Sequence, residues 1–282
     1  MCYCLWKMKN DIETSCTSCV LKQHPRTTTM YMLCSSDHSA FAAARILLRG
    51  VGLMQAVTLR QLAHVAGVVR LIGSNQTAAP EHLPFLVMQP FGRNLSFSDD
   101  AITILGAIRS VANTIGSMSQ LQPPIVHRDV SIGNIVVIDS CEDGITEQVL
   151  LIDFATARSL ATEQNEHDPS ALTGTSLFMA CSVLDGEPHS TSSDLESLFL
   201  VLLYLACGGH VHWANTIVCL REARDSKKAV LKVQEDFERY VLPKCSRSDL
   251  RPFVIALHAL FFRPQYNRSV VAETFLHALQ VH

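Results

Sequence analysis

The sequence predicts an α+β fold in two parts, a small mixed part followed by a larger and mainly helical part. Three observations support this prediction. Short apolar runs separated by Gly and Pro fill residues 40–92, and apolar residues then recur at helical spacing through residues 101–118. Two short β-type runs and an almost wholly apolar helix follow. We place the part boundaries at residues 1–35 (unclassified), 36–92 (the small part) and 93–282 (the helical part).

The composition favours a folded chain and excludes several functional classes. Hydrophobic residues make up 48% of the 282 residues and charged residues 17%, the opposite of a disordered balance. The net charge of −3 argues against a strongly basic nucleic-acid binder. The longest apolar run, Leu198 to Cys207, is too short to cross a membrane, and no apolar segment follows Lys7 and Lys9. We therefore expect a cytoplasmic or nuclear protein with no nucleic-acid or membrane partner.

The first 35 residues are rich in cysteine and show no sustained period. Two interpretations stay open. Cys2, Cys4, Cys16 and Cys19 have the composition of four zinc thiolates, but only one pair has knuckle spacing. The alternative is a disordered tail. The remaining cysteines are scattered, so we expect free thiols rather than a disulfide framework.

The small part is predicted to hold short strands around one helix. Residues 40–48 favour a strand or a short helix, and residues 54–66 favour a helix because apolar positions recur along them. Residues 68–72 and 85–88 are typical of short strands, with Gly67, Gly73 and Pro84 between them.

The helical part begins with a long amphipathic helix. Residues 98–100 (Ser-Asp-Asp) are a good helix start, apolar residues then recur from Ala101 to Met118, and the helix is expected to end before Pro123. The runs 135–138 and 149–152 predict a hairpin, because turn-forming residues separate them. The other expectations are an irregular segment over 159–175, a buried helix over 195–206 and a helix over 253–262.

The strongest chemical signal lies on this hairpin. His127, Arg128 and Asp129 are followed by Asn134 at the spacing H-R-D-x-x-x-x-N, and Asp153 comes after a short apolar run. Phosphoryl transfer needs such a set: a carboxylate that orients the attacking hydroxyl, and an Asn and an Asp that hold Mg²⁺ on a triphosphate. Alone, the His-Arg-Asp triplet would be a surface salt-bridge cluster, and Asp153 would merely end a strand. Their order and spacing together are specific to phosphoryl transfer.

With these motifs the sequence resembles the protein kinase superfamily, and most closely the fungal-type protein kinase family and related oomycete kinase-like proteins. The narrower match is carried by the segments 127–134, 151–157, 173–180 and 189–199. It is strong from Leu86 onward and weak from Ala40 to Pro84. The resemblance implies a two-lobed protein kinase-like fold with a shortened or degenerate N-lobe and a mainly helical C-lobe.

The resemblance also implies roles for individual residues. Asp129 is the expected catalytic base, Asn134 and Asp153 the Mg²⁺ ligands, and Thr175 a hydroxyl near Asp129. Arg128 is expected to pair with a phosphate on the loop after Asp153. Asp194 is expected to cap the start of the buried helix and to hold the backbone around His127 and Arg128. The expected contacts to ATP are Arg45, Met88, Gln89, Ser131, Asn134 and Asp153, with residues 86–92 as the hinge against the adenine.

Several positions depart from the kinase pattern. The sequence has no Gly-rich loop: Gly50 and Gly52 are the only glycines before Gly67. Arg45 stands where a strand Lys is usual. Gln55 stands where a helix Glu is usual. Ser131 replaces a common Lys, Ala155 replaces the Gly of Asp-Phe-Gly, and residues 180–182 (Ala-Cys-Ser) replace Ala-Pro-Glu.

We therefore predict a serine/threonine-type protein kinase that transfers the γ-phosphate of ATP, with Mg²⁺, to a protein hydroxyl. The alternative is a catalytically impaired pseudokinase that serves as a binding scaffold. Aminoglycoside-type phosphotransferases share an Asp-x-x-x-x-Asn, but Arg128 and the Thr-Gly-Thr sequence at residues 173–175 favour protein kinases.

Overall fold

The computed structural model describes residues 22–23, 29–34, 40–46, 51–75, 85–90, 92–138, 148–162, 173–214, 220–262 and 270–280. These residues fall into two compact units. Unit 1 comprises Met1–Ala56 and Arg70–Phe91, and unit 2 comprises Val57–Val69 and Gly92–His282. Most strands come before residue 160 and a run of helices follows, which agrees with the predicted α+β class.

Unit 1 contains a sheet in the order β1-β2-β3-β5-β4, with every neighbouring pair antiparallel. Its strands are β1 (Lys22–Gln23), β2 (Thr29–Cys34), β3 (Ala40–Ile46), β4 (Arg70–Asn75) and β5 (Phe85–Gln89). Residues 40–46 are thus a strand, which settles the open choice between strand and helix. β1 and β2 lie within the first 35 residues, where the sequence pattern predicted no element.

The helix α2 (Val51–Gln61) follows β3 and crosses the division between the units after Ala56. It begins three residues before the predicted start and ends before Leu62. After Gly67, the chain continues alongside β9 (Gln148–Leu151), because the Leu151 N–H donates to the Gly67 carbonyl at 2.7 Å. Gly67 has a φ of +79°, and a Cβ there would clash with the Thr114 hydroxyl, so both the backbone conformation and the packing against Thr114 require glycine.

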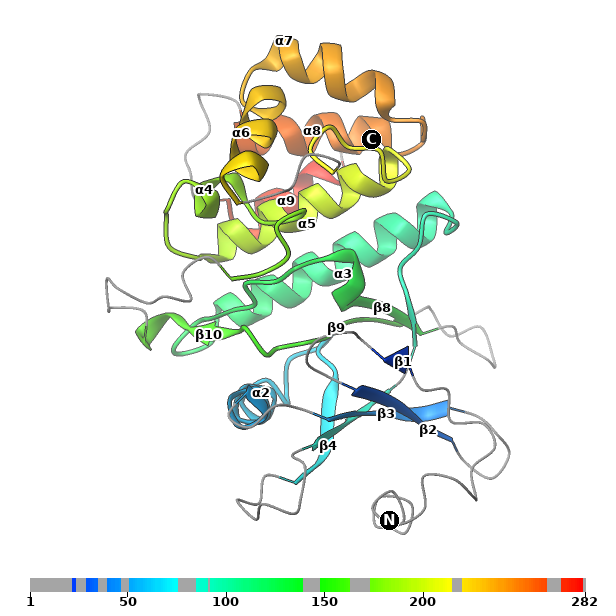
Figure 1. The fold of residues 1–282 in the computed structure, drawn as a ribbon, viewed down its shortest axis with the longest axis vertical. Coiled ribbons are helices and arrows are strands. Elements are labelled where there is room, and N and C mark those ends of the chain that lie inside the picture. Colours follow the sequence, from blue (N-terminus) through cyan, green and yellow to red (C-terminus); the bar gives the residue numbers. More distant parts are fainter. Residues whose placement is uncertain are drawn as a thin grey trace. The chain divides into compact units, whose positions relative to one another are not determined.

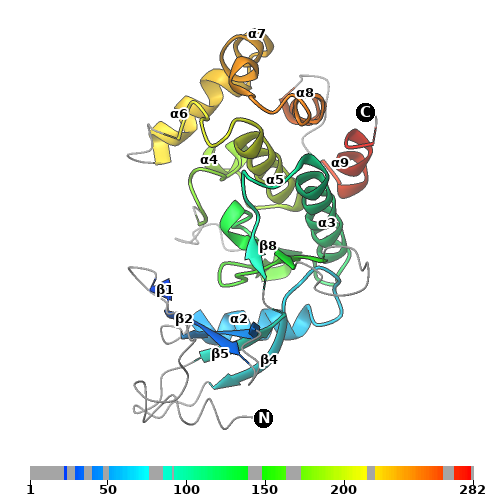
Figure 2. The same cartoon turned by 90° about the vertical axis from the view of Figure 1, so that its right-hand side faces the viewer.

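Unit 2 is built on α3 (Ala101–Ser119), which Figures 1 and 2 show beside α5 (Thr191–Ala206) and α9 (Ala272–Ala278). Asp100 caps α3 by accepting from the Thr103 N–H at 2.7 Å, which places the cap within the predicted helix start of residues 98–100. α5 is buried along nearly its whole length. Full burial of each Leu or Phe contributes about 1.5–3 kcal/mol, so α3 and α5 form the core of this unit.

The predicted hairpin is present. β8 (Ile135–Ile138) pairs antiparallel with β9, with Ile135 opposite Leu151, and β6 (Arg93–Asn94) flanks β8. A second small sheet pairs β7 (Ile125–Val126) with β10 (Arg158–Ser159). The remaining helices are α4 (Cys181–Leu184), α6 (Leu220–Leu231), α7 (Gln234–Asp236) and α8 (Arg251–Phe262), with short 3₁₀ turns at 132–134, 160–162 and 242–244 and a π-turn at 237–241.

Cysteine placement agrees with the expected free thiols where the structure describes it. Cys181, Cys207 and Cys245 are buried and unbridged. The four cysteines weighed as zinc ligands lie outside the described residues. Within the described part of the chain, no helix is both long and apolar enough to span a bilayer.

Candidate active site

A buried carboxylate at the start of α5 holds the segment that carries the predicted catalytic residues. Asp194 accepts from the backbone N–H of His127 at 2.7 Å and from that of Arg128 at 2.9 Å. Ser190 and Ser193 cap this helix end reciprocally. Burial raises the pKa of Asp194, while His127 and the two backbone N–H groups act in the opposite direction. Asp194 thus holds the backbone of His127 and Arg128 as expected, but the expectation that it caps the helix was wrong, because Ser190 is the cap.

The backbone at Arg128 is strained, with a φ of 71°. Gly174, whose φ is +117°, lies against it: a Cβ at Gly174 would be 2.5 Å from the Arg128 carbonyl oxygen. The Arg128 side chain is buried. A strained turn, a buried carboxylate and a glycine therefore fix the direction in which the next residue, Asp129, leaves the chain.

The His127 ring connects this turn to the segment after β9. The Asp129 N–H donates to Nδ1 at 3.3 Å, which places the ring proton on Nε2, and Nε2 donates to the Ile152 carbonyl at 3.0 Å. The ring also packs edge-on against Phe154, with centroids 4.7 Å apart. His127 is fully buried, so its function is to hold the two segments together.

The Asp129 carboxylate has a partner on each oxygen. Oδ1 accepts from both the backbone N–H and the hydroxyl of Thr175 at 2.8 Å, and Oδ2 accepts from the Asn134 amide at 3.1 Å. Asn134 also donates to the Asp129 carbonyl at 2.9 Å. The structure thus brings together Asp129, Asn134 and Thr175, three residues predicted from the sequence.

Asp153 lies beside Asn134 through the hairpin. The Asn134 carbonyl accepts from the Ile152 N–H at 2.9 Å, and Asp153 follows with a φ of 63°, a conformation rare for residues other than glycine. Because the Asn134 NH₂ group is used on Asp129, its amide oxygen remains as the acceptor end of that side chain. An amide oxygen and a carboxylate are the hard oxygen donors that suit Mg²⁺, so these two residues fit that ion.

The other predicted contacts to ATP lie on several different elements. Ser131 is buried and precedes the 3₁₀ turn that carries Asn134. Met88 and Gln89 are in β5 of unit 1, the first buried and the second exposed. Arg45 is in β3 opposite Leu86.

Three residues without a predicted role hold the loop around Thr175. Glu196 accepts from the Cys181 N–H at 2.6 Å, Lys227 donates to two loop carbonyls, and Trp213 donates to a third. A signal existed for Lys227: it shares the apolar stripe of α6 with Ala223, Val230 and Leu231 at helical spacing. A lysine in such a stripe indicates a buried cation with partners.

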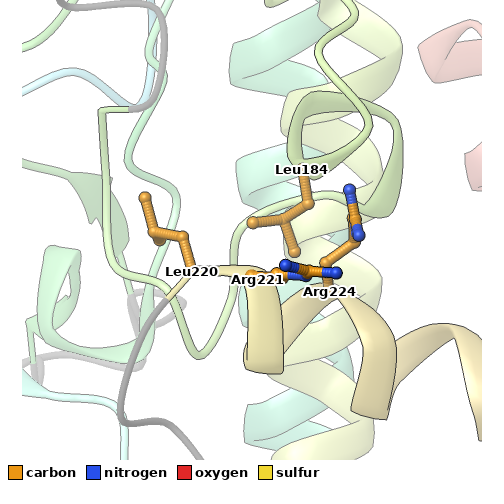
Figure 3. Close-up of a pocket in the computed structure, with 4 residues that line it drawn as sticks. All are labelled: Leu184, Leu220, Arg221 and Arg224. Atoms are coloured by element: carbon orange, nitrogen blue, oxygen red, sulfur yellow. The ribbon is translucent and has the colours of Figure 1, made fainter.

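A surface pocket of about 460 Å³ lies elsewhere, between α4 and α6 (Figure 3). It is lined by Leu184, Leu220, Arg221 and Arg224. None of these residues belongs to the cluster around Asp129. The predicted catalytic residues therefore do not line this cavity, and the polar cluster around Asp129 is the better candidate for the active site.

Comparison with known proteins agrees with this geometry. The fungal protein kinase family matches residues 10–206. Serine/threonine-protein kinase 33 of Mus musculus is 24% identical over 194 residues, which cover 64% of this chain and 37% of that protein. Serine/threonine-protein kinase PknB of Mycobacterium leprae (strain TN) is 28% identical over 141 residues, which cover 48% of this chain and 22% of that protein.

The chain thus spans well under half the length of these two curated relatives. The family match reaches from residue 10, so the likeness extends further toward the N-terminus than the motifs alone indicated. It also includes the turn around Asp129, the hairpin with Asp153 and the whole of α5. Because this match covers more than half of the sequence, the chain belongs to the fungal protein kinase family.

Proposed function

We propose that the chain transfers the γ-phosphate of ATP to a serine or threonine hydroxyl of a protein substrate. The observation that carries the proposal is the Asp129 carboxylate, held by Thr175 on one oxygen and by Asn134 on the other. Two fixed partners leave that carboxylate one orientation, which is what a group that positions an incoming hydroxyl requires.

In this proposal Asp129 orients the substrate hydroxyl and accepts its proton as the oxygen attacks the γ-phosphorus. The bond from the γ-phosphorus to the bridging oxygen breaks, and ADP leaves with that oxygen. Asn134 and Asp153 hold Mg²⁺, which when bound neutralises charge on the phosphates. Arg45, Met88, Gln89 and Ser131 are proposed as contacts to the nucleotide, on the basis of the resemblance.

The proposal is tested by phosphate transfer from γ-labelled ATP to the protein itself and to a generic basic protein. We expect incorporation with Mg²⁺ that falls by at least 100-fold in Asp129→Asn, because an amide accepts no proton. Asp225→Asn is the matched control, since Asp225 is an exposed carboxylate of α6. Phosphoamino-acid analysis separates Ser and Thr from Tyr. Equal incorporation in wild type and Asp129→Asn would contradict the proposal.

A second candidate is the impaired kinase that binds a partner without turnover. Gln55 favours it: the side chain is fully buried in α2, and neither its amide oxygen nor its amide nitrogen has a hydrogen-bond partner in the described part of the chain. A neutral amide there lacks the charge that a Glu would offer to a cation. A folded wild type that binds nucleotide but transfers no phosphate would select this candidate.

A further inference from the structure

Two buried side chains hold the backbone of the loop that follows Thr175. Lys227 Nζ donates to the Ser176 carbonyl at 2.8 Å and to the Met179 carbonyl at 2.7 Å. Trp213 Nε1 donates to the Leu177 carbonyl between them at 3.0 Å. Three carbonyls within four residues of the loop are thus bound by side chains that lie more than 30 positions later in the sequence.

The buried ammonium group of Lys227 binds the loop carbonyls in an environment that excludes water. The side chain is fully buried, and its ammonium group lies 5.9 Å from the centre of the Trp213 ring. Glu196 of α5 supplies negative charge nearby and binds the next stretch of chain, through the Cys181 N–H at 2.6 Å and the Ser182 hydroxyl at 3.3 Å. An ammonium group at such depth is retained only when its donors are satisfied, and here the carbonyls of Ser176 and Met179 accept from it.

These contacts reach Asp129 in one further step. The Thr175 carbonyl accepts from the N–H groups of Phe178 and Met179, each at 2.9 Å, so a tight turn links the bound carbonyls to Thr175. The N–H and hydroxyl of Thr175 then bind Asp129. Thr175 is itself exposed, so burial of its own side chain does not keep it in place.

We propose that Lys227 and Trp213 are positioning residues, which fix the loop Ser176–Met179 so that Thr175 stays bound to Asp129. They act from α6 and the turn before it, whereas residues 180–182 lack the Ala-Pro-Glu sequence that the resemblance expects at the end of this loop. The catalytic consequence rests on the proposed kinase function, but the positioning itself does not.

Lys227→Met in the full chain tests the proposal, because it keeps the length and the apolar stem and removes the donors. Lys228→Met is the matched control on the same helix, since Lys228 pairs with Asp185 at the surface. Amide hydrogen exchange is measured by mass spectrometry over residues 173–180. We expect at least tenfold faster exchange there in Lys227→Met, with α3 and α5 unchanged, and wild-type exchange in Lys228→Met.

Phosphate transfer gives the second readout. We expect kcat to fall at least tenfold in Lys227→Met with KM for ATP changed less than twofold, because the loop orients Asp129 and does not bind nucleotide. If wild type transfers no phosphate, the kinase proposal fails while the exchange data still decide the positioning.

If Lys227→Met does not fold, Trp213→Phe decides, since it removes the indole N–H and keeps most of the ring. Faster exchange over 173–180 in the folded Trp213→Phe protein would support the proposal. Unchanged exchange there in the folded variant would overturn it.

Discussion

At the scale of single residues, Gly174 controls how closely two loops approach. Alanine there would bring a Cβ to within 2.5 Å of the Arg128 carbonyl oxygen at a φ of +117°. We expect Gly174→Ala to be less stable than wild type. Gly186→Ala is the matched control, because Gly186 also has a positive φ (+90°) but no atom within 4 Å of its Cβ position.

The difference in unfolding free energy between these two variants separates the effect of the steric clash from that of the backbone strain. Gly174→Ala should lose about 1–3 kcal/mol more free energy of unfolding than Gly186→Ala, measured by urea denaturation. Equal losses would mean that the loops separate without cost.

Lys227 predicts a pH dependence of stability. Burial lowers its pKa to about 8 from the ordinary value of 10.5, and the charges of Cys181 and Glu196 oppose this shift. Between these two pH values the unfolded chain binds a proton that the folded chain does not, so stability rises with pH. The cost of burying the charge is complete below pH 8 and absent above pH 10.5.

Urea denaturation from pH 7 to pH 10.5 checks this prediction. The stability difference between wild type and Lys227→Met should shift in favour of wild type by up to roughly 3 kcal/mol over this range. The same comparison with Lys228→Met serves as the control. A flat difference would mean that Lys227 keeps its ordinary pKa.

At the scale of elements, the start of α5 sets the position of the turn before Asp129. Ser190 accepts from the Ser193 N–H at 3.2 Å, and this cap orients the helix turn that carries Asp194. Ser190→Ala should cost about 1 kcal/mol of unfolding free energy. Ser117→Ala is the control, because Ser117 is an exposed residue inside α3 whose hydroxyl donates to the Asn113 carbonyl of the same helix, and it should change stability by less than ~0.5 kcal/mol.

Elements with a clear period and a cap were predictable from the sequence. Asp100 and the apolar repeat define α3, and the two β-type runs define the hairpin of β8 and β9. β2 was missed because its residues show no apolar alternation, and β1 because it has only two residues. Pairing decides both structures instead, of β2 with β3 and of β1 with β2.

Within the site, local motifs were predictable and long-range supports were not. Asp129, Asn134 and Asp153 lie within 25 residues of one another in the sequence, and the pairing of β8 with β9 brings Asn134 and Asp153 together. Lys227 and Trp213 meet the loop from far along the sequence, and only tertiary packing selects their partners. Sequence spacing carries no information on such contacts.

At the scale of the whole molecule, the proposed nucleotide site predicts stabilisation by ligand. Mg·ATP at 100 times its Kd should add about 2.7 kcal/mol to the free energy of unfolding and raise Tm by roughly 5 °C. Asp153→Asn should reduce the shift, because it removes a carboxylate proposed to hold the ion. The shift is measured by scanning calorimetry, with EDTA in a parallel sample. A shift that survives EDTA would remove Mg²⁺ from the proposal.

The indole of Trp213 also makes the loop observable by light. The chain has two tryptophans, so Trp6→Phe leaves Trp213 as the sole indole emitter. Its ring is buried beside the Lys227 ammonium group, and its N–H is bound to the Leu177 carbonyl. Emission should therefore be blue-shifted while the loop is held and move to the red when it is released. The fluorescence of one side chain then follows, in real time, whether the loop around Thr175 is in place.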